Sequence, residues 1–180
     1  NSATTIGFML EVVPTSEPES WLHKQQLLIN GKPTVAGLVL FAEEPQAVLP
    51  KRTGIKLYRY QTTAEEGTRE TLLTDPISIE GDAYAQIREA VAKTAEIIES
   101  VRVNTPDGLE QVRYPITALH EIITNAVLHR DYSIADDIHI RIFDNRVEVI
   151  SPGTFPAHIT PGNILHERFA RNATIVRLIN

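Results

Sequence analysis

The stretch "YPITALHEIITNAVLHRDY", residues 114–132, has the spacing of an amphipathic helix, with Pro115 where a first helical turn accepts proline. At about 100° of rotation per residue, its apolar side chains gather on one side: Leu119, Ile122, Ile123, Ala126 and Val127. The opposite side is a polar stripe: Tyr114, Thr117, Glu121 and Asn125. Any surface helix presents a polar stripe to solvent. This stripe also sets a carboxylate and a carboxamide one turn apart, which suits a binding site.

The histidines of this stretch do not form a metal site. His120 and Glu121 begin like the His-Glu-x-x-His motif of zinc proteases, but residue 124 is Thr. His129 falls about 180° from His120 around the helix, so the two imidazoles face in opposite directions. We therefore exclude a zinc ion shared by these side chains.

The N-terminal part of the chain is expected to mix helix and strand. A Ser-x-x-Glu capping box at 16–19 predicts a helix that ends at Asn30-Gly31. Residues 33–42, "PTVAGLVLFA", form a continuous apolar run rich in β-branched residues, which predicts a buried strand. The run "IGFMLEVV" at 6–13 fits either a strand or a short helix.

The remaining elements follow from alternation, helical spacing and turn residues. Asp82 has the position of an N-cap for a long helix, and Asp144-Asn145 that of a hairpin turn. The predicted elements are a connector at 45–50, a strand at 54–62, a loop at 63–75, a strand at 76–81, a helix at 83–101, a turn-rich break at 104–111, a hairpin at 138–151, a Gly/Pro loop at 152–163 and a helix at 166–180.

The composition excludes several classes of protein. The chain has 180 residues and no cysteine, so it has neither disulfides nor thiolate metal sites. No apolar run reaches the roughly 18 residues of a membrane helix, which predicts a cytoplasmic protein without a membrane partner. The formal net charge of −6 gives no support for a nucleic-acid surface. The sequence also contains no Walker A or Rossmann phosphate loop.

Several motifs taken together resemble a known family. The segments "YPITALHEIITNAVLHRDYS", "IRIFDNRVEVISPGTFP", "ITPGN" and the later "RN" at 171–172 are similar to the ATP-binding C-terminal domain of bacterial and archaeal proteins classed as transcriptional regulators or RecG-helicase-related proteins. That domain belongs to the GHKL ATPase superfamily, together with gyrase, histidine kinases and MutL. The segments "GLVLFAEEPQ" and "KLYRY" resemble the later part of the Schlafen/AlbA-type domain that precedes it.

The resemblance implies a site for ATP and Mg²⁺ on the helix of residues 114–132. Superfamily members carry Glu-x-x-x-Asn on a helix, and Glu121 and Asn125 match that spacing. By this resemblance Glu121 would be the base that activates water, and Asn125 the Mg²⁺ ligand beside the phosphates. His129 and Arg130 would be donors near the phosphates. The other explanation for these two side chains is stabilisation of the helix C-terminus by cations.

The second motif departs from the superfamily pattern. In the superfamily, Asp-x-Gly-x-Gly follows a strand, and the Asp accepts a hydrogen bond from the adenine amino group. Here Ser151 stands in place of the Asp, Gly153 matches the first Gly, and Phe155 replaces the second. A serine hydroxyl accepts a hydrogen bond but carries no charge. The resemblance therefore implies nucleotide binding by Ser151 and Gly153, with a degenerate nucleotide site as the alternative.

The resemblance also implies an α+β fold in two parts. Residues 1–75 would be the C-terminal part of a Schlafen/AlbA-type α/β domain, and residues 76–180 a GHKL-like domain with helices on a mixed or antiparallel sheet. Because the chain starts at Asn1, we expect a piece of a longer protein that ends before the last glycine-rich box of the superfamily.

Two functions stay open for the protein. One is a DNA-associated transcriptional regulator or helicase-related protein with weak ATPase activity. Such a protein could form a homodimer. The other is a non-catalytic module that binds protein or nucleic acid. The aromatic and basic mixture around Tyr58, Arg59 and Tyr60 is expected to be a solvated strand face.

Overall fold

The computed structural model describes residues 7, 17–49, 52–105, 108–154, 162 and 170–179. Within these ranges no helix combines the length and the apolar character needed to cross a membrane. Most of the undecided run at 6–13 and most of the predicted Gly/Pro loop at 152–163 lie outside the described residues.

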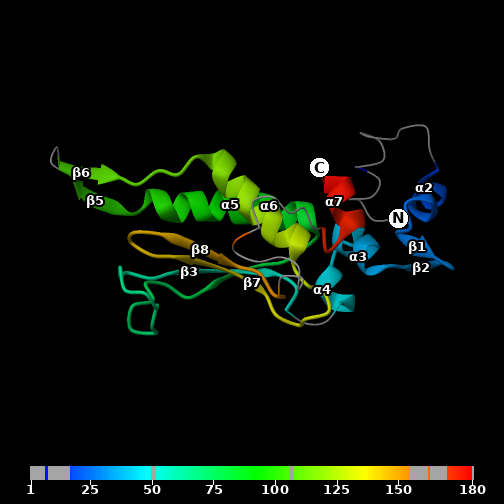
Figure 1. Ribbon diagram of the computed structural model, residues 1–180, viewed down its shortest axis with the longest axis horizontal. Coiled ribbons are helices and arrows are strands. Elements are labelled where there is room, and N and C mark those ends of the chain that lie inside the picture. The colour runs from blue at the N-terminus through cyan, green and yellow to red at the C-terminus, as the bar shows by residue number, and fades with distance from the viewer. Residues whose placement is uncertain are drawn as a thin grey trace.

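A four-stranded mixed sheet forms the centre of the fold (Figure 1). The strand order is β4-β3-β7-β8, in which β3 pairs antiparallel with β4 and parallel with β7, and β7 pairs antiparallel with β8. The strands are β3 (Ile55–Arg59), β4 (Ile77–Ile79), β7 (Ile138–Ile142) and β8 (Val147–Ile150). The predicted strands at 54–62 and 76–81 and the predicted hairpin at 138–151 are confirmed.

Two helices cover one face of this sheet. The helices α5 (Ala83–Glu99) and α6 (Ile116–His129) lie side by side over it (Figure 1). Strand alternation places the apolar residues of β3 and β7 under them, each at most 1% exposed: Ile55, Leu57, Ile138, Ile140 and Ile142. Asp82 caps α5 as predicted, since its carboxylate accepts from the Ala85 amide at 3.0 Å.

The N-terminal helix is shorter than the sequence predicts. It is α2 (Pro18–Lys24), and it is followed by a small hairpin of β1 (Leu28–Ile29) and β2 (Lys32–Pro33). Asn30 and Gly31 both have positive φ, 51° and 71°, so this Asn-Gly pair makes the hairpin turn and does not end the helix.

The predicted buried strand at 33–42 is wrong, because this run contains the helix α3 (Val35–Phe41). The Thr34 hydroxyl caps the helix by accepting from the Gly37 amide at 3.2 Å. The run is short and mostly buried, and in that situation apolar residues do not distinguish a helix from a strand. Gly37 also packs against the Leu27 backbone: a Cβ added there would lie 2.4 Å from the Leu27 carbonyl oxygen.

Short elements replace two predicted connectors. Residues Pro45–Val48 form α4 where the sequence predicts a connector, and β5 (Arg102–Thr105) pairs with β6 (Gly108–Gln111) where it predicts a turn-rich break. The described part of the predicted C-terminal helix is α7 (Ala173–Ile179). The Tyr84 hydroxyl on α5 donates to the carbonyl of Leu178 on α7 at 2.9 Å, which ties the chain end to the core.

Helices packed on a mixed sheet confirm the predicted α+β fold class. The sheet crosses the boundary predicted near residue 76, because β3 precedes that position whereas β4, β7 and β8 follow it. The division into domains at 1–75 and 76–180 stays a prediction.

Candidate functional site

Helix α6 exposes the two side chains that the sequence singles out. Glu121 and Asn125 are both exposed, one helical turn apart, while Leu119 and Ile123 beneath them are 3% and 0% exposed. Neither Glu121 nor Asn125 has a hydrogen-bond or ion-pair partner among the described residues. Ile122, predicted to be buried, is 46% exposed, so the apolar side of the helix is narrower than its spacing suggests.

The loop after β8 lies against the C-terminal half of α6. The Ser151 hydroxyl donates to the carbonyl of Ala126, the residue after Asn125, at 2.8 Å. The Asp131 amide donates to the Pro152 carbonyl at 2.8 Å. These two hydrogen bonds place the Ser-Pro-Gly-Thr loop, residues 151–154, against the C-terminal half of α6, at Ala126 and Asp131.

Gly153 is required by the conformation and the packing of this loop. Its φ is +123°, a value that residues with a side chain rarely adopt. A Cβ added at Gly153 would also lie 3.1 Å from the Cβ of Asp131. The backbone of the loop can therefore approach the end of α6 only with glycine at this position.

Two residues without a role in the sequence analysis hold this arrangement together. Arg171 forms an ion pair with Asp131 at 2.9 Å and also donates to the Thr154 carbonyl. The Asn172 side-chain amide donates to two carbonyls at the end of α6, Leu128 at 2.8 Å and Arg130 at 2.9 Å. The Arg-Asn pair is part of the family resemblance, but no local pattern of the sequence indicates its contact with a helix end far away in the chain.

His129 lies beside this contact and is half-buried. Burial lowers the pKa of His129 below its usual value, and the positive charge of Arg171 lowers it further. The neutral imidazole is therefore favoured near pH 7, where it is both a donor and an acceptor.

Arg130 lies inside the protein, with 1% of its surface exposed. Its guanidinium donates to the Asp136 carbonyl at 2.5 Å and stacks on the Tyr132 ring, 4.9 Å from the ring centroid. Burial lowers the pKa of Arg130, although neighbouring acidic groups oppose that shift. Placed in this way, Arg130 supports the turn that follows α6 and does not face the side of the helix that carries Glu121 and Asn125.

The exposed pair suits a hard cation bound to a polyanion. Mg²⁺ takes oxygen ligands and keeps several waters, so one carboxamide oxygen and the ligand's own phosphates are sufficient. Within the described ranges no group of three or more His, Asp or Glu side chains is placed to bind a metal by itself. Two clefts among the described residues lie elsewhere and are not lined by Glu121 or Asn125.

The fold is similar to that of a known crystal structure. The DIP2311 protein from Corynebacterium diphtheriae matches with a TM-score of 0.69 and 22% sequence identity. The match covers 99% of this chain and 35% of that one, so this chain spans about a third of that protein. At this identity the likeness concerns the fold alone.

The sequence matches a family model over its C-terminal part. Residues 135–180 match the model described as "Putative ATP-dependent DNA helicase recG C-terminal". No curated protein matches the sequence significantly. The matched segment includes β7, β8, the Ser-Pro-Gly-Thr loop and α7.

Proposed function

We propose that α6 and the Ser-Pro-Gly-Thr loop form a site for Mg-ATP. One observation carries the proposal: Glu121 and Asn125 are exposed and unpaired among the described residues, on the helix whose C-terminal half the Ser151 hydroxyl joins to the loop. The family match over the adjacent residues 135–180 supports ATP as the nucleotide.

Each residue of the proposed site has a role that its chemistry allows. The Asn125 carboxamide oxygen binds the cation, and the Glu121 carboxylate orients and deprotonates the attacking water. Bound Mg²⁺ would neutralise negative charge on the phosphates. The Ser151 hydroxyl, whose proton is given to Ala126, keeps its lone pairs to accept from the base, and Gly153 lets the loop pass close to it. His129 is a neutral donor near the phosphates.

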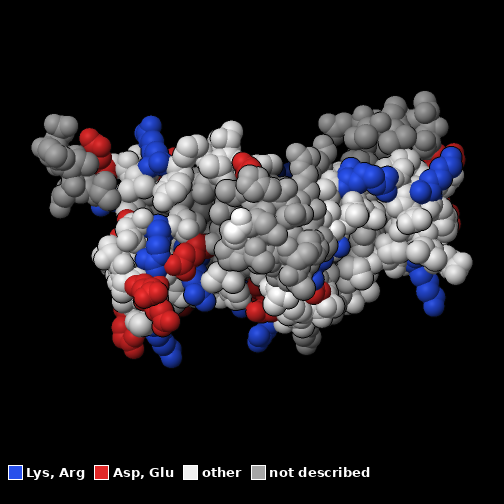
Figure 2. Space-filling model, viewed as in Figure 1, with Lys and Arg blue, Asp and Glu red and all other residues white. Residues whose placement is uncertain are grey.

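For the longer protein we propose association with DNA, as a helicase-related protein or a transcriptional regulator. The family description supports DNA as the partner. The charge of this chain does not, because basic and acidic side chains are interspersed on the face shown in Figure 2 and do not form one basic patch. We therefore assign no DNA contact to this face.

A second candidate is a non-catalytic module with a degenerate nucleotide site. Ser151 favours it, since an uncharged hydroxyl that already donates to Ala126 recognises adenine less strongly than a carboxylate does. Binding and hydrolysis of ATP distinguish the two functions.

Calorimetry with Mg-ATP tests the proposal. Asn125→Ala should raise the Kd for Mg-ATP at least about tenfold, which is about 1.4 kcal/mol, and chelation of Mg²⁺ by EDTA should have a comparable effect. Glu121→Gln should leave binding intact and lower any hydrolysis by about a hundredfold. Thr117→Ala, exposed on the same face of α6, is the matched control and should change neither quantity.

Three results would decide against this account. Equal heats for wild type and Asn125→Ala would remove Asn125 from the site. Absence of heat in every variant would refute Mg-ATP binding by the chain. Tight binding without hydrolysis, unchanged by Glu121→Gln, would favour the non-catalytic module.

A further inference from the structure

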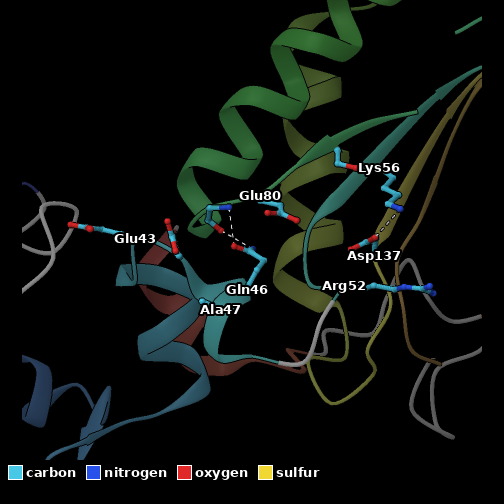
Figure 3. Close-up of a pocket in the computed structure, with 10 residues that line it drawn as sticks. Glu43, Gln46, Ala47, Arg52, Lys56, Glu80 and Asp137 are labelled. Carbon is cyan, nitrogen blue, oxygen red and sulfur yellow. Dashed lines mark hydrogen bonds and ion pairs between the residues drawn. The ribbon is translucent and has the colours of Figure 1, made fainter. Parts of the chain in front are cut away.

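A large polar cleft lies away from α6, where four parts of the chain meet. It has a volume of about 610 Å³ and is bounded by α4, the start of β3, the end of β4 and Asp137 just before β7 (Figure 3). A volume of this size is within the range of small-molecule sites in proteins. The Mg-ATP proposal uses none of the residues in its walls.

The walls of the cleft are held in place by internal hydrogen bonds. The Gln46 carboxamide donates to the Gly81 carbonyl and accepts from the Gly81 amide, both at 3.1 Å, which joins α4 to the turn before α5. Asp137 accepts from the Gly54 amide at 3.1 Å and lies 3.8 Å from the Lys56 ammonium. A ligand would therefore meet a preformed cleft in which these groups already have partners.

Three other charged groups in the walls, all of them exposed, have no such partner among the described residues. The carboxylates of Glu44 and Glu80 and the guanidinium of Arg52 form no hydrogen bond or ion pair within the described part of the chain. Figure 3 shows Glu80 and Arg52 on different sides of the cleft, with Arg52 on the side of Lys56 and Asp137. The cleft thus offers two separate kinds of recognition, one for a cation and one for an anion.

The overall charge of the cleft decides which kind of ligand is favoured. Four carboxylates and two cationic side chains line it, a net charge of −2: Glu43, Glu44, Glu80, Asp137, Arg52 and Lys56. Such a surface repels polyphosphates and attracts ligands with a net positive charge. The single unpaired cation, Arg52, favours a ligand that carries a carboxylate as well.

We propose that this cleft binds a small zwitterion with a net positive charge, of the class of basic α-amino acids. The cationic end of the ligand lies against the acidic wall that contains Glu80, and its carboxylate lies against Arg52. The ligand is distinct from the nucleotide, and its site does not depend on Glu121 or Asn125.

Titration of the ¹⁵N-labelled chain with three small molecules, followed by NMR, tests the charge pattern. L-arginine carries both charges, putrescine lacks the carboxylate, and L-norvaline lacks the side-chain cation. The proposal expects L-arginine to shift the backbone amides of Ser78 and Gly81, and to bind at least about tenfold more tightly than either of the other two. No shift at millimolar L-arginine, or equal affinity for all three molecules, would overturn it.

Variants locate the two charged contacts. Glu80→Gln and Arg52→Gly should each weaken L-arginine binding at least about tenfold. Glycine suits the positive φ of Arg52, 70°, so Arg52→Gly removes the guanidinium without adding backbone strain.

Glu89→Gln and Arg88→Gln, exposed on α5, make the same changes in net charge away from the cleft and should leave binding unchanged. If these controls weaken binding as much as Glu80→Gln and Arg52→Gly do, the attraction is a general charge effect and the assigned site is wrong. Mg-ATP titrated into the same variants should bind as it does to wild type, which separates this proposal from the nucleotide site.

Discussion

The amide of Asn172 should contribute more to stability than any single exposed side chain near it. It is the only group among the described residues that donates to both the Leu128 and the Arg130 carbonyls, at 2.8 and 2.9 Å. Those carbonyls belong to the end of α6, where the helix leaves its own acceptors unpaired. In Asn172→Ala both hydrogen bonds are lost while the backbone is retained.

The expected cost follows from these two bonds. At about 0.5–1.5 kcal/mol for each hydrogen bond, Asn172→Ala should lower the free energy of unfolding by about 1–3 kcal/mol. For a chain of this size that corresponds to a fall in Tm of roughly 2–4 °C per kcal/mol. Asn172→Asp should have a cost of similar size, because a carboxylate cannot donate either hydrogen bond. Its charge is disfavoured at the C-terminus of α6 but favoured at the N-terminus of α7, which begins at Ala173.

Urea unfolding followed by circular dichroism measures both variants, with Thr174→Ala on the same segment as the control. Both Asn172 variants are expected to be less stable than wild type, with the control close to wild type. An Asn172→Ala or Asn172→Asp variant as stable as wild type would refute the capping role.

Three other changes probe the same architecture. Burial lowers the pKa of His129 in the folded chain, so as pH falls the unfolded chain takes up the imidazole proton before the folded chain does. The contribution of His129 to stability is therefore present above pH ~6.5, the usual pKa of histidine, and is lost as pH falls below that value. His129→Asn should flatten that part of a plot of Tm against pH. Gly153→Ala should destabilise the chain by about 1–3 kcal/mol through its φ of +123°. Gly153→Ala should destabilise the chain more than Gly108→Ala, because Gly108 has a similar φ of +121° but open space around the added methyl group. Equal losses of stability in urea unfolding would show that the contact of the added methyl group with Asp131 is unimportant. Gly37→Ala should cost at least about 1–3 kcal/mol, because its methyl group meets the Leu27 carbonyl at 2.4 Å, and a Tm equal to wild type would contradict that packing.

The sequence predicts the long and regular elements well. Helices α5 and α6 repeat their apolar spacing over several turns, and β7 alternates Ile138, Ile140 and Ile142 with polar residues, so period and burial agree. Short elements are less predictable. The α3 run is apolar on nearly all sides, and tertiary burial decides its conformation. The Asn30-Gly31 pair fits both a helix stop and a hairpin turn.

The candidate site is predictable only where it is local in the chain. Glu121 and Asn125 share one face because they belong to one helix, and helical geometry is sufficient to show it. The contacts of Arg171 and Asn172 with the end of α6 join residues about forty positions apart, which no local pattern indicates. The burial of Arg130 likewise depends on tertiary contacts. Its side chain points into the protein, although the neighbouring His129 is only half-buried.

The most direct test of the central claim is to locate the cation itself. Mn²⁺ added together with ATP, in place of Mg²⁺, broadens the NMR signals of nearby nuclei. The account predicts broadening of the Asn125 side-chain amide and of the Gly153 backbone amide only when both ATP and Mn²⁺ are present. Broadening centred on other residues, or signals at Asn125 and Gly153 that stay sharp while ATP binds, would contradict a nucleotide site on α6.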